Sequence, residues 1–403
     1  MKKQRLKTCV ALTIGIVCLI AFRDIPIYVY LTGDILLEKD ICSTKLISNT
    51  SIDLSQKKVI LHLGENGREL NDVFKFDGCE YSNCVFQYCD GDGGYASRAD
   101  VILFSYNSPY VYLNLPSYVR QRQIWLAYSM ESLAYGYLKW PSPIDHFDGI
   151  VTYLQNSHLI SLPFGFKTVK KVTSSTPAKV NYAQGKTKGA FTYVSNCKTF
   201  YNRMQVIKDL SKSIDIDVFG DCTGRYPCAS NADFDCKTRL HSQYHFYLAF
   251  EDSLCKEFIT DQFWNSLKSD GYFIPVSLGG LSLEEYTRVA PPNSFLHLYN
   301  FSTVSHMGQY LQHLLTYSSS FNRYHQWRNN YTISTKPSKH QACQFCKAIN
   351  NPEKLKVAQD RKFADEWNNL NNCRPLWLSA SQRLTSGWLM IGLQFLYLAS
   401  LLL

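Results

Sequence analysis

Polar side chains that could meet an anionic ligand stand where a segment of helical pattern begins, at Thr260, Asp261 and Gln262. Thr260 and Asp261 can cap the helix or occupy its first turn. The N–H groups at the start of such a helix favour an anion, such as a diphosphate. An ordinary capped helix explains the same residues without a ligand. These residues therefore allow a diphosphate site but do not require one.

Two patterns of metal-ligating residues are present, and both are weak. Cys343-Gln-Phe-Cys346 is half of a zinc motif, without a second CxxC or HxxxH pair nearby. Three Asp-x-Asp pairs, which begin at Asp90, Asp215 and Asp233, imitate a divalent-metal motif. The first stands in a glycine-rich turn and the second in a strand-like run, so we interpret all three as structural or solvated. We expect no metal site.

The bulk composition describes a globular chain with apolar ends. A length of 403 residues suffices for two domains. A hydrophobic fraction of 45% with 14% aromatic residues excludes a disordered chain. The net charge of +9 is spread along the chain without a sustained basic stripe beyond the first seven residues. That distribution argues against nucleic acid and suits a basic cleft for an anionic substrate.

Short apolar runs of strand type alternate with longer segments of helical type, and the pattern occurs twice. The strand-like runs of the first half are 59–63, 101–104, 124–128 and 149–153, and those of the second half are 189–194, 214–219, 246–250 and 274–276. A polar bridge over 173–188 separates the two halves. The alternation predicts two α/β units with parallel sheets that face each other across a cleft.

Both ends of the chain have the composition of membrane-seeking segments. Four basic residues in Met1–Lys7 precede an apolar stretch through Phe22 and a second apolar run, 25–31. We favour a retained anchor with the N-terminus in the cytosol, and a cleaved signal peptide is the alternative. The apolar tail, 388–403, fits a GPI-anchor signal, a second membrane segment or a packed amphiphilic helix.

The cysteines indicate an oxidising compartment. Of fourteen cysteines, Cys9 and Cys18 lie in the apolar N-terminal segment, which leaves an even number, twelve, for the remainder. N-glycosylation sequons at Asn49, Asn300 and Asn330 agree with that compartment.

The stretch Phe246–Leu267, followed by Ile274–Gly280, resembles the signature of the alpha-1,3-fucosyltransferases, glycosyltransferase family 10. The family pattern is close to F-x-L-x-F-E-N-S-x-x-x-D-Y-V-T-E-K-x-x-N-A-L. Other blocks are similar in the right order: Arg120–Ser132, Thr152–Gly165, Val194–Cys197 with Arg203, Asp217–Gly220 and His340–Cys346. The likeness covers roughly residues 59 to 350, which is more specific than any single motif.

The resemblance implies a GT-B architecture of two Rossmann-like domains, with an N-terminal membrane anchor. It implies an inverting enzyme that transfers L-fucose from GDP-fucose in alpha-1,3 linkage to GlcNAc of N-glycans or related glycoconjugates. Glu131, which matches the family's glutamate before Ser, is the expected general base. Arg203 is expected to fork onto the phosphate oxygens of the donor. The other expected donor-binding residues are Asp252, Phe258, Thr260, Asp261 and Gln262.

The same resemblance sets expectations for cofactors, partners and location. No cofactor is needed for the chemistry, and Mn²⁺ or Mg²⁺ is expected at most to stimulate it. The partners are GDP-fucose, a glycoprotein or glycan acceptor and the membrane, with no nucleic acid. The expected location is the Golgi membrane, as a single-pass type II protein with a luminal catalytic domain. The expected segments are a cytoplasmic tail 1–7, a signal-anchor 8–31, a stem 32–58, an acceptor-side domain 59–178, a GDP-sugar domain 179–342, a disulfide-tied segment 343–386 and a hydrophobic tail 387–403.

Four donor positions depart from the family pattern: Asp252 stands for Asn, Phe258 for Tyr, Asp261 for Glu and Gln262 for Lys. The last change removes a positive charge beside the diphosphate, and Lys256 is the nearby candidate to replace it. Losing a charge-assisted bond costs about 1.5–3 kcal/mol. Two alternatives follow: a weakly active member that binds glycans or partners, or a member that uses another nucleotide sugar.

The resemblance also implies disulfides that tie the C-terminal segment to the first domain. Cys79 and Cys89 match the family's N-terminal cysteine pair and would join Cys343 and Cys346. A pair of Cys197 with Cys255 is a further expectation, and the remaining loop cysteines, Cys222, Cys228 and Cys236, are expected to be extra staples.

Overall fold

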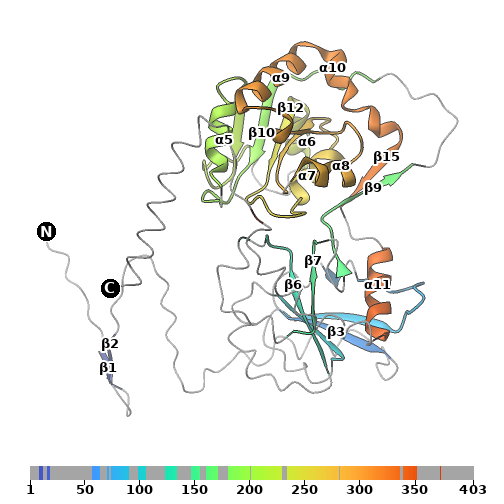
Figure 1. Ribbon diagram of the computed structural model, residues 1–403. Helices are drawn as coiled ribbons and strands as arrows, with labels where there is room; N and C mark the ends of the chain where they lie inside the picture. Colours follow the sequence, from blue (N-terminus) through green and yellow to red (C-terminus); the bar gives the residue numbers. More distant parts are fainter. Residues whose placement is uncertain are drawn as a thin grey trace.

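A computed structural model gives the fold. It describes residues 9–11, 16–18, 57–63, 70–71, 74–89, 99–105, 123–132, 134, 147–154, 160–170, 180–199, 201–228, 234–280, 282–335, 339–351 and 373. Within them the chain forms two α/β units, each with a parallel sheet (Figure 1). The predicted α/β class with parallel sheets is confirmed.

The first sheet has the strand order β4-β3-β5-β6-β7-β8, and every neighbouring pair is parallel. Its strands are β3 (Lys58–Leu63), β4 (Cys84–Cys89), β5 (Val101–Ser105), β6 (Ile124–Ser129), β7 (Gly149–Thr152) and β8 (Ile160–Ser161). All of β5 is buried, as expected for a central strand covered on both faces.

The second sheet has the order β11-β10-β12-β13-β14 and is also wholly parallel. Its strands are β10 (Lys188–Tyr193), β11 (Ile216–Phe219), β12 (Tyr244–Phe250), β13 (Ile274–Leu278) and β14 (Leu296–His297). The described helices of this unit are α5 (Arg203–Leu210), α6 (Phe234–Ser242), α7 (Asp261–Lys268), α8 (Leu283–Val289), α9 (Val304–Thr316) and α10 (Ser318–Arg323), with the 3-10 turns η4 (Leu298–Asn300) and η5 (Gln326–Asn329).

The two sheets share one topology. In the first sheet, β4 and β5 flank β3 on opposite sides. In the second sheet, β11 and β12 flank β10 in the same way. The chain therefore reverses direction across the sheet between β3 and β5, and again between β10 and β12. Such a switch point leaves a crevice beyond the carboxyl ends of the two strands, where α/β proteins bind ligands.

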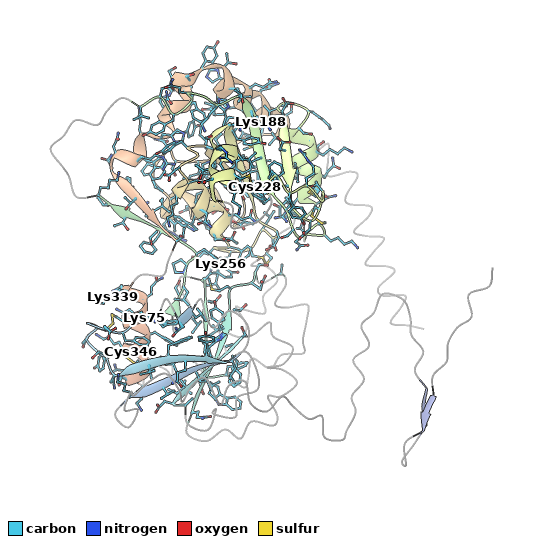
Figure 2. The ribbon with its side chains drawn as sticks, turned by 180° about the vertical axis from the view of Figure 1, so that it is seen from behind. Lys75, Lys188, Cys228, Lys256, Lys339 and Cys346 are labelled. Atoms are coloured by element: carbon cyan, nitrogen blue, oxygen red, sulfur yellow. A yellow bond between two sulfur atoms is a disulfide. The ribbon has the colours of Figure 1, made fainter. Side chains whose placement is uncertain are left out.

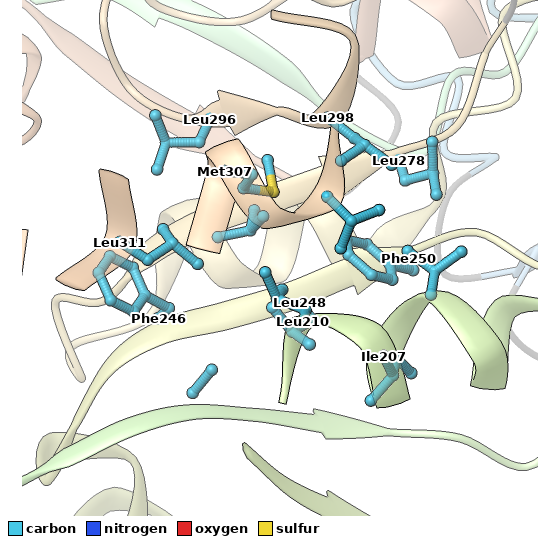
Figure 3. Packing of buried hydrophobic residues seen from close by; sticks show 14 of the residues in the cluster. Ile207, Leu210, Phe246, Leu248, Phe250, Leu278, Leu296, Leu298, Met307 and Leu311 are labelled. Atoms are coloured by element: carbon cyan, nitrogen blue, oxygen red, sulfur yellow. The ribbon is translucent and has the colours of Figure 1, made fainter. Parts of the chain in front are cut away.

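The core of the second unit lies between its sheet and the helices α5 and α9. Phe246, Leu248 and Phe250 of β12 point into it and meet Leu210 of α5 and Leu311 of α9 (Figure 3). These residues are buried, and burying each large apolar side chain contributes about 1.5–3 kcal/mol. This packing holds the carboxyl end of β12 in place.

The chain passes between the units twice. After β8, strand β9 (Phe166–Val169) pairs antiparallel with β15 (Tyr331–Ser334). The chain then returns, and α11 (Lys339–Asn350) packs on the first unit, where Phe345 lies 5.0 Å from Phe74 between ring centroids. The last described helix thus belongs to the core of the first unit.

Apolar contacts also join the units directly. The ring of Phe258, in the loop after β12, lies 5.2 Å from that of Tyr153 at the end of β7. Gly165 faces Trp264 of α7 so closely that an added Cβ would lie 2.3 Å from the indole. A larger residue at position 165 would force the two surfaces apart.

The disulfides confirm part of the expected connectivity and correct the rest. Cys79–Cys343 forms as expected, but Cys346 bonds to Cys84 rather than to Cys89. The expected partner was wrong because Cys84 and Cys89 stand at opposite ends of β4, roughly 17 Å apart in an extended strand. Since Cys343 and Cys346 are both oxidised, neither offers a thiolate to zinc.

The expected Cys197–Cys255 pair is also wrong. Cys197 bonds to Cys222, which follows the strand next to β10, and Cys255 bonds to Cys373. Cys255 is fully buried in the first unit's apolar cluster, because the loop after β12 reaches across the junction. Cys228 and Cys236 form the remaining described disulfide.

At the N-terminus the structure describes two short strands, β1 (Cys9–Ala11) and β2 (Ile16–Cys18), paired antiparallel. The rest of the expected anchor 8–31, the stem 32–58 except its last two residues, and the tail 387–403 lie outside the described residues. None of the helices in the described ranges is long and apolar enough to cross a membrane.

The Cys84–Cys346 disulfide closes a long loop, so its removal should destabilise the protein. We expect Cys346→Ser to lower the free energy of unfolding by about 2–4 kcal/mol under oxidising conditions. Denaturant titration with intrinsic fluorescence measures the change. With a reductant, the variant and the wild type should converge; equal stability of the two under oxidising conditions would contradict the assigned pairing.

Candidate functional site

Arg203, at the first position of α5, lies at the switch point of the second sheet. Its Nη1 donates a hydrogen bond to the carbonyl of Phe250 at the end of β12, at 2.8 Å. Its Nη2 donates to the carbonyl of Asn196 in the loop after β10, also at 2.8 Å. The side chain is buried, and its Nε has no hydrogen-bond partner. Arg203 therefore brings a positive charge to the crevice between β10 and β12.

The loop from Glu251 to Thr260, which we call the donor loop, leads from the end of β12 into α7. Thr260 caps the helix, and its hydroxyl accepts from the N–H of Gln262 at 3.4 Å. The predicted cap is thus present. Asp261 occupies the first turn and accepts from the side chain of Asn265 at 3.3 Å. The N-terminus of α7 lies directly after the loop that starts at the switch point.

Glu251 is the site residue that the sequence analysis did not single out. Its carboxylate is buried, and Oε1 accepts a hydrogen bond from the N–H of Thr260 at 2.8 Å. This bond joins the two ends of the donor loop. Burial raises the pKa of Glu251 to about 8, against hydrogen bonds from Thr260 that lower it. A glutamate directly after a wholly buried strand was the available signal.

The phenol rings of two buried tyrosines surround Glu251. The hydroxyl of Tyr201 donates to the main-chain carbonyl of Glu251 at 2.7 Å. The hydroxyl of Tyr286, on α8, is buried without a hydrogen-bond partner. An added Cβ on Gly279 would lie 2.5 Å from that hydroxyl and 2.4 Å from Cγ of Glu251. A glycine is therefore required where β13 ends, because both side chains pass over it.

Asp252 and Phe258, two expected donor-binding residues, have different surroundings. Asp252 is half-buried and accepts from the hydroxyl of Ser253 at 3.1 Å. Burial raises its pKa, and the bond from Ser253 and the charge of Arg203 oppose that rise. Phe258 is buried against Tyr153 of the first unit instead of lining a polar site. The phenylalanine that replaces the family's tyrosine at position 258 therefore lies in an apolar junction between the units.

Two more polar residues complete the donor loop and the start of α7. Gln262 is half-buried, and its Oε1 accepts from the hydroxyl of Tyr247 at 3.5 Å. Lys256 is half-buried in the middle of the loop and lies where the two units meet (Figure 2). A lysine is therefore present on the donor loop, although position 262 at the start of α7 lacks one.

Glu131, the expected base, lies in the first unit. It is exposed and comes two residues after the end of β6. The carboxyl ends of the parallel strands of a sheet meet at one edge, so Glu131 stands on the ligand-binding edge of that sheet. Sequence patterns placed Glu131 and the donor loop on separate units, and the structure does the same.

A cavity of about 210 Å³ lies at the junction, and residues of both units line it. Tyr153 and Phe164 line it from the first unit, and Glu257, Glu285 and Trp264 from the second. Glu257 adopts a left-handed backbone, with φ of 56°, and its N–H donates to Glu285 at 3.0 Å. A strained residue in a loop at a junction indicates that the loop's shape is fixed by its surroundings.

Asp217, the second residue of the Asp-x-Asp pair that begins at Asp215, lies in β11 and has a structural role. Asp217 forms ion pairs with Lys188 at 3.3 Å and Arg225 at 3.0 Å, and accepts from the hydroxyl of Tyr244 at 2.6 Å. Within the described residues, no group of three metal-ligating side chains could hold a metal ion.

The raised pKa of Glu251 predicts a pH dependence of stability. The folded protein keeps this carboxyl protonated up to about pH 8, whereas the unfolded chain releases the proton near its ordinary pKa of 4.5. Wild-type stability should therefore fall as pH rises through that window, by roughly 1 kcal/mol per pH unit. Glu251→Gln keeps an acceptor for Thr260 and should remove this slope.

Urea unfolding of both proteins between pH 5 and pH 9 measures the slope. The difference in unfolding free energy should move in favour of Glu251→Gln as the pH increases. A difference that is constant over this range would show that Glu251 is ionised in the folded protein.

Known proteins similar to this chain are fucosyltransferases. Residues 183–364 match the family model described as "Glycosyltransferase family 10 (fucosyltransferase) C-term". The chain is 29% identical over 306 residues to "Alpha-(1,3)-fucosyltransferase fut-1" of Caenorhabditis elegans, which covers 74% of this chain and 65% of the relative. It is 27% identical over 317 residues to "Glycoprotein 3-alpha-L-fucosyltransferase A" of Drosophila melanogaster, covering 77% and 60%.

The matched part spans less than two thirds of either relative. Among solved structures, a crystal structure of an alpha1,3-fucosyltransferase matches 76% of this chain and 95% of its own chain, at 13% identity and a TM-score of 0.49. Residues 183–364 therefore match the C-terminal domain of a glycosyltransferase family, and the chain is similar to alpha-1,3-fucosyltransferases.

Proposed function

We propose that this chain is an inverting glycosyltransferase of GT-B architecture that transfers L-fucose from GDP-fucose in alpha-1,3 linkage to GlcNAc of N-glycans or related glycoconjugates. One observation carries the proposal. The part of the chain that matches family 10 has a buried cation, Arg203, at its switch point, next to a helix N-terminus capped by Thr260. A positive charge and the positive end of a helix dipole at such a crevice suit the diphosphate of a nucleotide sugar.

In this mechanism Arg203 neutralises the charge that develops on the leaving diphosphate. Its two terminal nitrogens each give one N–H to the carbonyls of Phe250 and Asn196. A guanidinium has five N–H groups, so the others can bind phosphate while these two bonds fix the crevice walls. The N-terminus of α7 adds the positive end of its helix dipole.

Glu131 acts as the base on the acceptor hydroxyl. In a single displacement, the base removes the proton of the attacking oxygen while the bond between fucose and diphosphate breaks on the opposite face. An exposed carboxylate on the first unit meets this need, because the acceptor must approach the donor from across the cleft. The reaction then needs no metal for its chemical step, and Mn²⁺ or Mg²⁺ at most stimulates it.

The altered donor positions favour a second candidate, a weakly active member that binds glycans. Gln262 replaces a lysine of the family pattern, and Asp252 adds a carboxylate at the crevice. Burial raises the pKa of Asp252, which lowers the cost of that carboxylate near a diphosphate. A different nucleotide-sugar donor remains the third candidate, and measuring transfer separates all three.

We further propose that the protein is a luminal Golgi enzyme, held as a single-pass type II membrane protein by residues 8–31. The disulfides support an oxidising lumen, because such bonds persist there and are rare in the cytosol. A direct test expresses residues 32–378 as a secreted protein and follows GDP-fucose consumption with GlcNAc-terminated acceptors. Absence of transfer on every acceptor would contradict the first candidate.

We expect Glu131→Gln to lower kcat by about 10²–10⁴-fold with little change in KM for GDP-fucose, because it removes the base but no donor contact. The matched control is Glu284→Gln, which neutralises an exposed glutamate on α8 and should leave kcat unchanged. Initial rates with varied GDP-fucose give both constants. Equal kcat for the two variants would remove Glu131 from the base role.

We expect Gln262→Lys to tighten GDP binding about tenfold, because it restores a charge-assisted bond at the start of α7. Isothermal titration of GDP measures the affinity without requiring turnover. Gln205→Lys adds the same charge at an exposed position of α5 and serves as the control. If both lysines act alike, the effect comes from overall charge; if neither acts, GDP does not reach position 262.

A further inference from the structure

A second cavity, of about 470 Å³, lies on the second unit away from the donor loop. Lys268, the last residue of α7, lines it, whereas Thr260 caps the other end of that helix. Eight helical residues span roughly 12 Å. Tyr272 also lines it and precedes β13, so the cavity is at the amino ends of the strands. The switch point faces the opposite edge.

Positive charge predominates in the wall of this cavity. Lys170, Lys268 and Arg328 line it, against one carboxylate, Asp270. The guanidinium of Arg328 stacks on two rings, with its carbon 4.5 Å from the centroid of Trp327 and 5.1 Å from that of Tyr272. Stacking fixes the plane of a guanidinium and leaves its edge available for hydrogen bonds.

Tyr272 is held in an unusual backbone conformation at the cavity wall. Its φ is +48°, a left-handed conformation that a large side chain rarely adopts, and the residue is 37% exposed. The rings of Tyr182 and Tyr272 lie 5.2 Å apart between centroids. A strained residue that presents an aromatic ring to solvent is typical of a binding site, because burial does not explain the strain.

Two of the three cations also have a structural role. Lys268 stands in the last turn of α7, where a cation complements the helix dipole. The ammonium of Lys170 donates to the carbonyl of Arg328 at 2.5 Å. These roles account for single residues, but not for three cations and an exposed, strained tyrosine around one cavity.

We infer that this cavity binds an acidic saccharide. Aromatic rings contact the apolar faces of pyranose rings, and the cations pair with a carboxylate or sulfate group. The inference does not rest on the proposed transferase activity. Two sources could supply the saccharide: a glycan of another molecule, or a glycan on Asn330, an exposed sequon residue between two residues of the cavity wall, Asn329 and Tyr331.

The test measures binding of sulfated and of uncharged N-acetyllactosamine to the full chain in detergent, by saturation-transfer NMR and titration. The chain carries Asn330→Gln to remove its own glycan. We expect the sulfated saccharide to bind at least tenfold more tightly than the uncharged one. Lys268→Glu should remove most of that preference, whereas Lys208→Glu, the same change at an exposed position of α5, should not.

Tyr272→Asn separates binding from structure, because asparagine tolerates the left-handed backbone better than tyrosine does. We expect this variant to keep or raise the thermal midpoint and to bind the sulfated saccharide at least fivefold more weakly. Loss of stability with unchanged affinity would overturn the inference, as would equal binding of the two saccharides or equal effects of Lys208→Glu and Lys268→Glu.

The source of the saccharide follows from a comparison of the wild-type chain with the Asn330→Gln chain, both made in glycosylating cells. Binding by the Asn330→Gln chain alone assigns the cavity to the protein's own glycan, and equal binding by both chains assigns it to an external glycan. Either result supports the inference. Binding by neither chain overturns it.

Discussion

The donor side of the molecule depends on the two hydrogen bonds of Arg203. They connect the carbonyl of Phe250, at the end of β12, to that of Asn196, in the loop after β10. These are the two strands between which the chain order reverses. A buried guanidinium needs hydrogen-bond acceptors, and strand ends supply carbonyls that the ladder has left unpaired. The buried charge of Arg203 therefore organises the walls of the crevice.

The donor loop is fixed by a different set of constraints at each point along its length. The bond from Thr260 to Glu251 closes its ends, Cys255 is tied to Cys373, and Phe258 is packed on the first unit. The donor loop thus follows a strand of the second unit, but its side chains pack on both units. Glu251 and Asp252 remain at the crevice because Cys255 and Phe258 are held in the junction between the units.

Much of this arrangement could be predicted from the sequence. The alternation of short apolar runs with helical segments indicates two α/β units with parallel sheets, since buried parallel strands are continuous apolar runs. The cap at Thr260 follows from a local rule about helix starts.

The place of Arg203 at a switch point required the strand order, which no local pattern contains. The partners of Cys346 and Cys197 were mistaken for the same reason, because spacing along the chain does not give distances between strands. The role of Glu251 depends on burial, which no local pattern gives, and a motif position does not show that Phe258 packs against the first unit.

We propose that a nucleotide sugar binds in the crevice between β10 and β12. Hydrogen–deuterium exchange of the protein with and without GDP-fucose tests this binding site. We expect slower exchange in peptides that contain residues 196–203 and 251–262, and unchanged exchange at the opposite edge of the sheet, in residues 268–273. Protection confined to that opposite edge, or no protection at saturating GDP-fucose, would contradict it.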